Sequence, residues 1–157
     1  MSRRSRFTAL VTLSLMIFAG SAFAGKRTIS DPNDVGRHRI DIKSASHGHS
    51  GRRITHTIVS YRRFNTSRAP CVIMETNQQG EDDFAACGLS GMINLHQQRT
   101  TGNLSIDRPN RKTVVYKFKR RAINQPVLYR WFIQDHGPDE CPGCDRAPNN
   151  GYVLHRL

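Results

Sequence analysis

The chain has 157 residues, 24 of them basic and 12 acidic, so its formal net charge is +12, and hydrophobic residues make up 37% of it. This length and composition are typical of one folded domain and exclude a disordered chain, which would have too few apolar residues to form a core. The excess of basic residues favours attraction to anionic material such as wall polymers, acidic glycans, phospholipid surfaces or nucleic acid, although net charge also serves solubility.

Residues 1–24 have the pattern of a secretory signal peptide. Three arginines stand before residue 7, an apolar run covers residues 7–20, and residues 22–24 (Ala-Phe-Ala) match a small-residue cleavage site. The apolar run is about 14 residues long, whereas a membrane-spanning helix needs about 20. We therefore expect cleavage after Ala24 and no transmembrane anchor afterwards. The exported chain, expected to be a monomer, would carry a charge of +9, because three arginines leave with the segment.

Beyond the signal peptide we expect an extended leader at residues 25–38 and a single domain at residues 39–157. Alternating apolar and polar residues, rich in β-branched side chains, are typical of β-strands. The pattern predicts strands at 40–44, 54–64, 71–76, 84–87, 92–95, 113–118, 128–134 and 152–154.

The segments between these strands are rich in turn residues. Residues 46–53 and 101–110 are expected to be turns, and residues 120–124 one helical turn. Six to eight short strands without a long helical period favour an all-β fold, an antiparallel, jelly-roll-like β-sandwich.

Four cysteines follow the signal peptide, and an even number in an exported chain suggests two disulfide bonds. Three pairings are possible, and strand placement favours Cys71 with Cys87 and Cys141 with Cys144. The first bond would join neighbouring strands and close a loop of about 15 residues. Residues 141–144 (Cys-Pro-Gly-Cys) also have the spacing of a redox centre or of half a zinc site. Their acidic, proline- and glycine-containing surroundings favour a disulfide that holds a loop.

The loop between the strands at 71–76 and 84–87 is a candidate calcium site. Oxygen-bearing side chains at alternate positions, followed by Gly80 and then carboxylates, are typical of loops that wrap a hard cation. A strong site would have Asp where Gln79 stands, and no bidentate Glu follows at EF-hand spacing, so a solvated acidic loop is the alternative. The candidate calcium ligands are Glu75, Asn77, Gln79, Asp82 and Asp83.

Three of the seven histidines are candidates for a ligand-binding site. On a strand, His47 and His49 would point to the same face, and His56 would approach them from the neighbouring strand. Three imidazoles can bind zinc or copper. The alternative is a set of exposed histidines around a turn.

Aromatic residues gather on two predicted strands, and Trp131 is the only tryptophan. With basic neighbours they would form a stacking platform for sugars or bases, or else they fill the core. We count Trp131 with the three histidines as a candidate ligand-binding residue. The aromatic residues are Tyr116, Phe118, Tyr129, Trp131 and Phe132.

Two functions fit this sequence. The first is a secreted, non-enzymatic protein, free or at the cell envelope, that binds anionic or glycan material. The second is a small basic hydrolase, nuclease-like or acting on wall polymers, in which a histidine is the general acid, Glu75 the general base, and arginines neutralise phosphate. No catalytic motif is present, so no catalytic residue is assigned, and no specific recognition of nucleic acid is expected.

Short runs near both ends of the domain carry a family resemblance. They are residues 31–34 (Asp-Pro-Asn-Asp), 40–42, 47–49, 108–114, 129–131, 141–149 and 153–155. In these runs the chain resembles uncharacterised secreted proteins of actinobacteria. The resemblance implies a β-sandwich-like extracellular domain and brings no established activity. In that group the loop after the third strand often reads Asp-Thr-Asp-Gly, from which Glu75, Asn77 and Gln79 depart.

Overall fold

The computed structural model describes residues 26–34, 40–65, 69–77, 81–88, 91–135 and 144–157. Its strands, in chain order, are β1 (Arg27–Ser30), β2 (Ile42–Ser50), β3 (Arg53–Ser60), β4 (Cys71–Glu75), β5 (Phe84–Cys87), β6 (Gly91–Asn94), β7 (Arg99–Gly102), β8 (Leu104–Asn110), β9 (Thr113–Lys119), β10 (Leu128–Gln134), β11 (Arg146–Ala147) and β12 (Val153–Arg156). A 3-10 turn, η2 (Arg120–Ile123), lies between β9 and β10. Within the described ranges no helix is long and apolar enough to cross a membrane.

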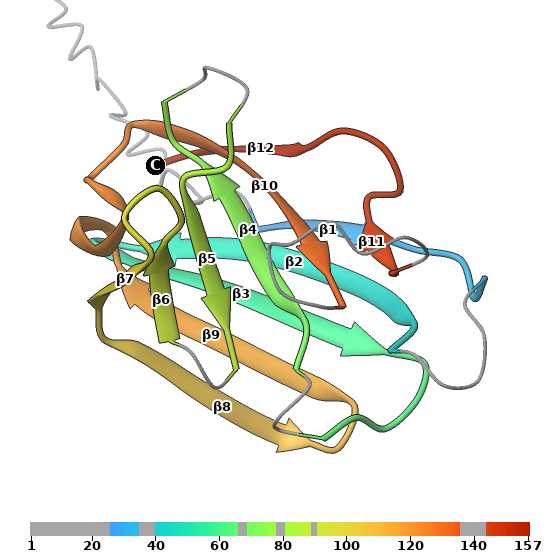
Figure 1. The fold of residues 1–157 in the computed structure, drawn as a ribbon. Helices are drawn as coiled ribbons and strands as arrows, with labels where there is room; N and C mark the ends of the chain where they lie inside the picture. The colour runs from blue at the N-terminus through green and yellow to red at the C-terminus, as the bar shows by residue number, and fades with distance from the viewer. Residues whose placement is uncertain (1–25, 35–39, 66–68, 78–80, 89–90, 136–143) are drawn as a thin grey trace, which may run out of the picture.

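The described strands form two antiparallel sheets that pack face to face as a sandwich (Figure 1). Sheet A has the order β1-β2-β3-β9-β8, and sheet B has the order β11-β10-β4-β5-β6-β7, with β12 also paired to β10. The antiparallel β-sandwich predicted from the sequence is therefore confirmed. The strands are more numerous than predicted, since the described residues contain twelve of them.

The core lies between the two sheets and follows from the period-two pattern. In β3, Ile54, His56 and Ile58 point inward and are fully buried, while Thr55 and Thr57 between them are partly exposed. All five residues of β4 are buried, because a second apolar cluster covers the outer face of sheet B. A strand buried on both faces has a continuous apolar run instead of an alternation. The outer cluster consists of Cys71, Ile73, Ala85, Cys87 and Phe132.

Two predicted turns are wrong. Residues 46–53 are mostly strand, because β2 and β3 extend up to a turn at Gly51 and Arg52, where Gly51 has a φ of 55° that suits glycine. Residues 101–110 contribute to β7 and β8. Pro109 is tolerated there because β8 lies at the edge of sheet A, where a missing N–H costs little.

Other predicted elements match the structure closely. Residues 120–123 form η2, where one helical turn was expected, and β5 and β10 have the predicted bounds. The segment expected as an extended leader contributes β1, which pairs with β2.

The Cys71–Cys87 disulfide is confirmed. The pairing of β4 with β5 places Val72 opposite Ala86, so the next residues along, Cys71 and Cys87, face each other with their Cα atoms 4.4 Å apart. Cys144 is also disulfide-bonded. Cys141, its predicted partner, lies outside the described residues.

Candidate functional site

The histidines singled out in the sequence come together between the two sheets. His47 and His56 are directly opposite each other in the pairing of β2 with β3, and His49 lies two residues further on the same face. A fourth histidine, His155 on β12, reaches them from sheet B, and its ring stacks on His47 with the centroids 3.9 Å apart. We call these four residues, with Tyr129 and Trp131 of β10, the histidine cluster.

A chain of hydrogen bonds links the members of this cluster. The Tyr129 hydroxyl lies 2.8 Å from Nε2 of His56 and 2.9 Å from Nδ1 of His155. Nε2 of His155 lies 2.9 Å from Nδ1 of His49, and Nε1–H of Trp131 donates to Nδ1 of His47 at 2.9 Å. The cluster thus satisfies most of its own polar groups, as buried polar side chains generally do.

Two histidines of the cluster, His56 and His155, have lowered pKa values. Burial, and then the neighbouring His47 and His155, hold the pKa of His56 well below its usual value of 6.5. Burial, followed by His47 and His49, lowers the pKa of His155 to about 3. Nδ1 of His56 has no hydrogen-bond partner among the described residues. If Nε2–H of His56 donates to Tyr129, a lone pair and not a buried N–H is left unpartnered, which is the less costly arrangement.

The ring nitrogens of this cluster bond to each other and do not converge on a metal position. In the part of the chain that the structure describes, only one group of His, Cys, Asp and Glu side chains brings three ligand atoms within 4.8 Å of one another, and it contains no histidine. The histidine cluster therefore has the arrangement of a hydrogen-bonded core.

Trp131, Tyr116, Tyr129 and Phe118 are part of that core, while Phe132 belongs to the apolar cluster on the outer face of sheet B. Trp131, Tyr116 and Tyr129 are fully buried, while Phe118 and Phe132 are 2% and 4% exposed. Buried rings cannot stack on an external sugar or base. Of the two alternatives from the sequence, core packing is the one observed.

The predicted calcium loop is organised around Asp83. Its carboxylate accepts hydrogen bonds from the backbone and side chain of Thr76, from the backbone and side chain of Asn77, and from His96. Burial would raise the pKa of Asp83, but these bonds outweigh it and lower the pKa. The structure therefore gives Asp83 a local role in holding the loop.

The other candidate calcium ligands do not gather with Asp83 around one point. Glu75 is fully buried and forms an ion pair with Arg130 across β4 and β10. Asp82 accepts a hydrogen bond from Tyr152, and Gln79 lies outside the described residues. Calcium binding by this loop stays a prediction.

Glu75 and the histidine cluster lie on opposite faces of sheet B. Along β4, Met74 packs in the core between the sheets, so its neighbour Glu75 points to the outer face. The cluster lies in the core, on the inner face. Glu75 and the histidines of this cluster are therefore not assembled into an acid–base pair.

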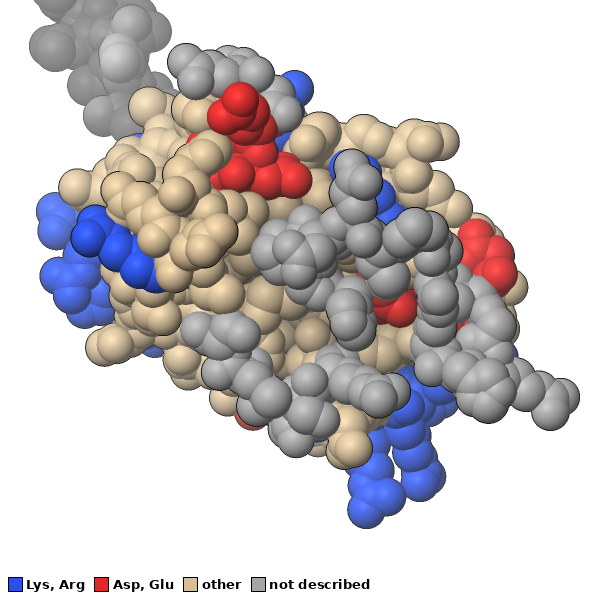
Figure 2. Space-filling view, in the orientation of Figure 1, with Lys and Arg blue, Asp and Glu red and all other residues tan. Residues whose placement is uncertain are grey.

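A basic pocket that was not predicted from the sequence lies at one end of sheet A. It has a volume of about 410 Å³, and four of its lining side chains are cationic: Arg53, Lys117, Lys119 and Arg121. Thr101, Asn103 and Ser105 also line it and supply hydroxyl and amide groups. Figure 2 shows Lys and Arg gathered at the edge of the molecule where η2 and β7 lie.

The strand pairings explain how the pocket acquires its charge. Arg53 on β3 lies directly opposite Lys119 on β9, and Lys117 is two residues from Lys119 on the same face. Among the described residues, Lys117 forms an ion pair with Asp107 at 3.8 Å; both side chains are partly exposed, and such pairs are weak. In the sequence, the basic residues at alternate positions 117, 119 and 121 were the only feature that pointed to this pocket.

Gly102 allows the pocket floor to close. A Cβ atom at Gly102 would lie 3.0 Å from Cβ of Ala122, an unusually tight contact, so glycine helps β7 to approach η2 closely. The hydroxyl of Thr101 also donates to the backbone oxygen of Ala122 at 3.1 Å. These contacts hold Arg121 beside the strand cations.

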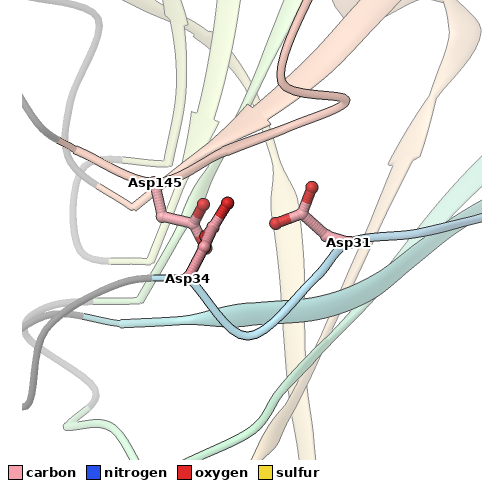
Figure 3. A group of neighbouring side chains, drawn as sticks. All are labelled: Asp31, Asp34 and Asp145. Atoms are coloured by element: carbon pink, nitrogen blue, oxygen red, sulfur yellow. The ribbon is translucent and has the colours of Figure 1, made fainter.

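Three aspartates form a second charged group at the end of β1. Asp31 and Asp34 follow β1 in the chain, Asp145 precedes β11, and their carboxylates point toward one another (Figure 3). Burial, followed by the charges of Asp145 and Asp34, raises the pKa of Asp31 to about 7, and burial raises the pKa of Asp145 to about 6. We call these three residues the aspartate cluster.

Comparison with known proteins adds no assignment to these sites. No protein-family model matches the chain, and no curated protein matches it.

Proposed function

We propose that this is an exported, non-enzymatic β-sandwich protein that binds anionic polymers, and that the basic pocket is the binding site. The observation that carries the proposal is the placement of Arg53 opposite Lys119 on neighbouring strands. Like charges in that position destabilise a sheet by roughly 0.2–1 kcal/mol. An anionic group bound between the two side chains would offset that repulsion.

The surroundings of this pair support the same chemistry. Lys117 and Arg121 add two further cations, and Asn103 and Ser105 add neutral donors. A guanidinium binds phosphate or carboxylate through two parallel hydrogen bonds, and ammonium groups add charge. Cations spaced along β9 can engage successive charged groups of one chain, so a polymer fits better than a single small anion.

Export is supported by the signal-like segment at residues 1–24 and by the disulfides, which persist in oxidising compartments. The resemblance to secreted actinobacterial proteins agrees with it. An anionic polymer of the cell envelope is then the ligand class that such a protein meets. Carbohydrate recognition would act through acidic groups of the polymer, because Trp131 and the other core aromatics are buried.

Binding to immobilised polyphosphate and alginate, with neutral dextran as the control polymer, tests this proposal. We expect the purified protein to bind both polyanions and not dextran, with an affinity that falls steeply as salt rises. Lys119→Gln should weaken binding roughly tenfold, the equivalent of about 1.4 kcal/mol, and should reduce the slope of log affinity against log salt by about one unit.

Arg111→Gln is the matched control variant. Arg111 is exposed in the turn between β8 and β9, outside the residues that line the pocket, and its removal changes the net charge by the same amount. Equal weakening by Arg111→Gln and Lys119→Gln would mean that binding follows net charge alone. That result would refute a specific role for the pocket.

A further inference from the structure

The aspartate cluster joins two distant parts of the sequence. Asp31 and Asp34 stand at the start of the domain, and Asp145 stands more than a hundred positions later, where the chain enters β11. One carboxylate oxygen from each residue lies within 4.8 Å of those of the other two. Figure 3 shows that the three side chains converge from two separate loops.

Two of these carboxylates are buried, which makes their closeness unfavourable unless a proton or a cation lies between them. Asp31 and Asp145 are each 4% exposed, and only Asp34 is open to solvent. Moving like charges into a low-dielectric environment strengthens their repulsion. In the described residues, one oxygen of Asp31 is buried with no hydrogen-bond partner.

A fourth carboxylate near the cluster also lacks hydrogen-bond partners. Asp41, which immediately precedes β2, is fully buried, and both its oxygens lack hydrogen-bond partners among the described residues. It is close enough to interact electrostatically with Asp31, Asp34 and Asp145. Burial raises the pKa of Asp41, the positive charge of Arg62 lowers it, and the negative charge of Asp34 raises it. An unpaired buried carboxylate is costly, so a bound cation would resolve the arrangement.

From this geometry we propose that Asp31, Asp34 and Asp145, with Asp41 beside them, bind one divalent cation of the calcium class. Calcium lies about 2.3–2.6 Å from its oxygen ligands, so ligands on opposite sides of the ion are about 5 Å apart, which suits the observed spacing. The donors are all carboxylates, with no thiolate or imidazole. This donor set suits a hard cation and not zinc.

The cation would also have a structural effect. The backbone N–H of Ile42 already donates to the carboxylate of Asp145, which links the start of β2 to the segment before β11. A shared metal ion would tie β1 to both of them. The site shares no residue with the basic pocket, so it is independent of the proposed polymer binding.

Calorimetric titration with calcium, after removal of metals by a chelator, tests the assignment. We expect one calcium ion per chain and a melting temperature that rises with the logarithm of calcium concentration. Magnesium should bind at least tenfold more weakly, and zinc should not compete. No heat and no thermal shift at millimolar calcium would overturn the proposal, as would zinc binding tightly in place of calcium.

Variants locate the site. Asp34→Asn changes an exposed residue and should leave the fold intact while weakening calcium binding at least tenfold. Asp145→Asn should do the same, because an amide oxygen can still accept from Ile42. Asp107→Asn removes an aspartate outside this group and should bind calcium as the wild type does.

Two results would contradict this location. Calcium binding that survives both Asp34→Asn and Asp145→Asn would mean that the ion binds elsewhere. Binding that is lost in Asp83→Asn but kept in Asp145→Asn would transfer the site to the loop between β4 and β5. A melting temperature that changes with pH but not with calcium concentration would also refute the proposed cation site.

Discussion

Tyr129→Phe tests whether the histidine cluster stabilises the sandwich through its hydrogen bonds. Phe retains the ring of this fully buried residue, so the change removes one hydroxyl and leaves no large cavity. That hydroxyl is the partner of both His56 and His155. Because Nδ1 of His56 has no partner in the described structure, the variant would leave the whole His56 ring unsatisfied.

The expected magnitude follows from counting the groups that lose a partner. Two buried ring nitrogens are left unpaired, and each unsatisfied buried polar group costs about 1–3 kcal/mol. Allowing for partial relaxation, Tyr129→Phe should lower the free energy of unfolding by about 2–4 kcal/mol. Urea unfolding at pH 7.5, followed by circular dichroism and tryptophan fluorescence, measures this difference.

Tyr116→Phe is the control for this experiment. Tyr116 is equally buried in the same core, but its hydroxyl donates to a single backbone oxygen, that of Pro70. Its loss should cost about 1 kcal/mol. If Tyr129→Phe costs no more than Tyr116→Phe, the cluster contributes nothing beyond ordinary packing and the reasoning is refuted.

Three further predictions concern pH, the disulfide and the loop between β4 and β5. Burial lowers the pKa of His56, so below pH 6.5 this side chain binds a proton in the unfolded chain but stays unprotonated in the folded chain. The stability advantage of wild type over His56→Gln should therefore shrink by up to about 2 kcal/mol between pH 7 and pH 5, and an unchanged difference in urea unfolding would contradict the burial argument. Replacing Cys71 and Cys87 with serine should lower the free energy of unfolding by about 3 kcal/mol, because the bond closes a loop of 16 residues in the unfolded chain. Urea unfolding with an unchanged midpoint and an unchanged slope would contradict this. Asp83→Asn should lower the free energy of unfolding by about 2 kcal/mol at pH 7. Because the pKa of Asp83 is lowered in the folded chain, this difference should become smaller as the pH drops below 3.8. A difference that does not change with pH would exclude the carboxylate charge as the cause.

The sequence predicted the strands that have either a period-two alternation or, as in β4, a continuous apolar run. In β9, Val114, Tyr116 and Phe118 point to the core, and the alternation is clear in the sequence. β7 and β8 were missed because they are edge strands with mostly exposed residues, so their hydrophobicity has no period. An edge strand is defined by the neighbour to which it bonds, and this information is absent from its own residues.

The candidate sites divide in the same way. His47, His49 and His56 could be grouped in advance because one hairpin brings them together. Tyr129 and His155 arrive from the other sheet and complete the hydrogen-bond chain only when the two layers pack.

The sequence by itself determined the β class, the pairing of Cys71 with Cys87 and the meeting of the histidines on β2 and β3, because each depends on period-two alternation or on segments that are near in the chain. Only the tertiary structure decided where charge accumulates. Arg53 meets Lys119 through the pairing of β3 with β9, and Asp145 meets Asp31 through the closing of the sandwich. Contacts between residues so far apart in sequence depend on sheet order and packing, which local patterns do not specify.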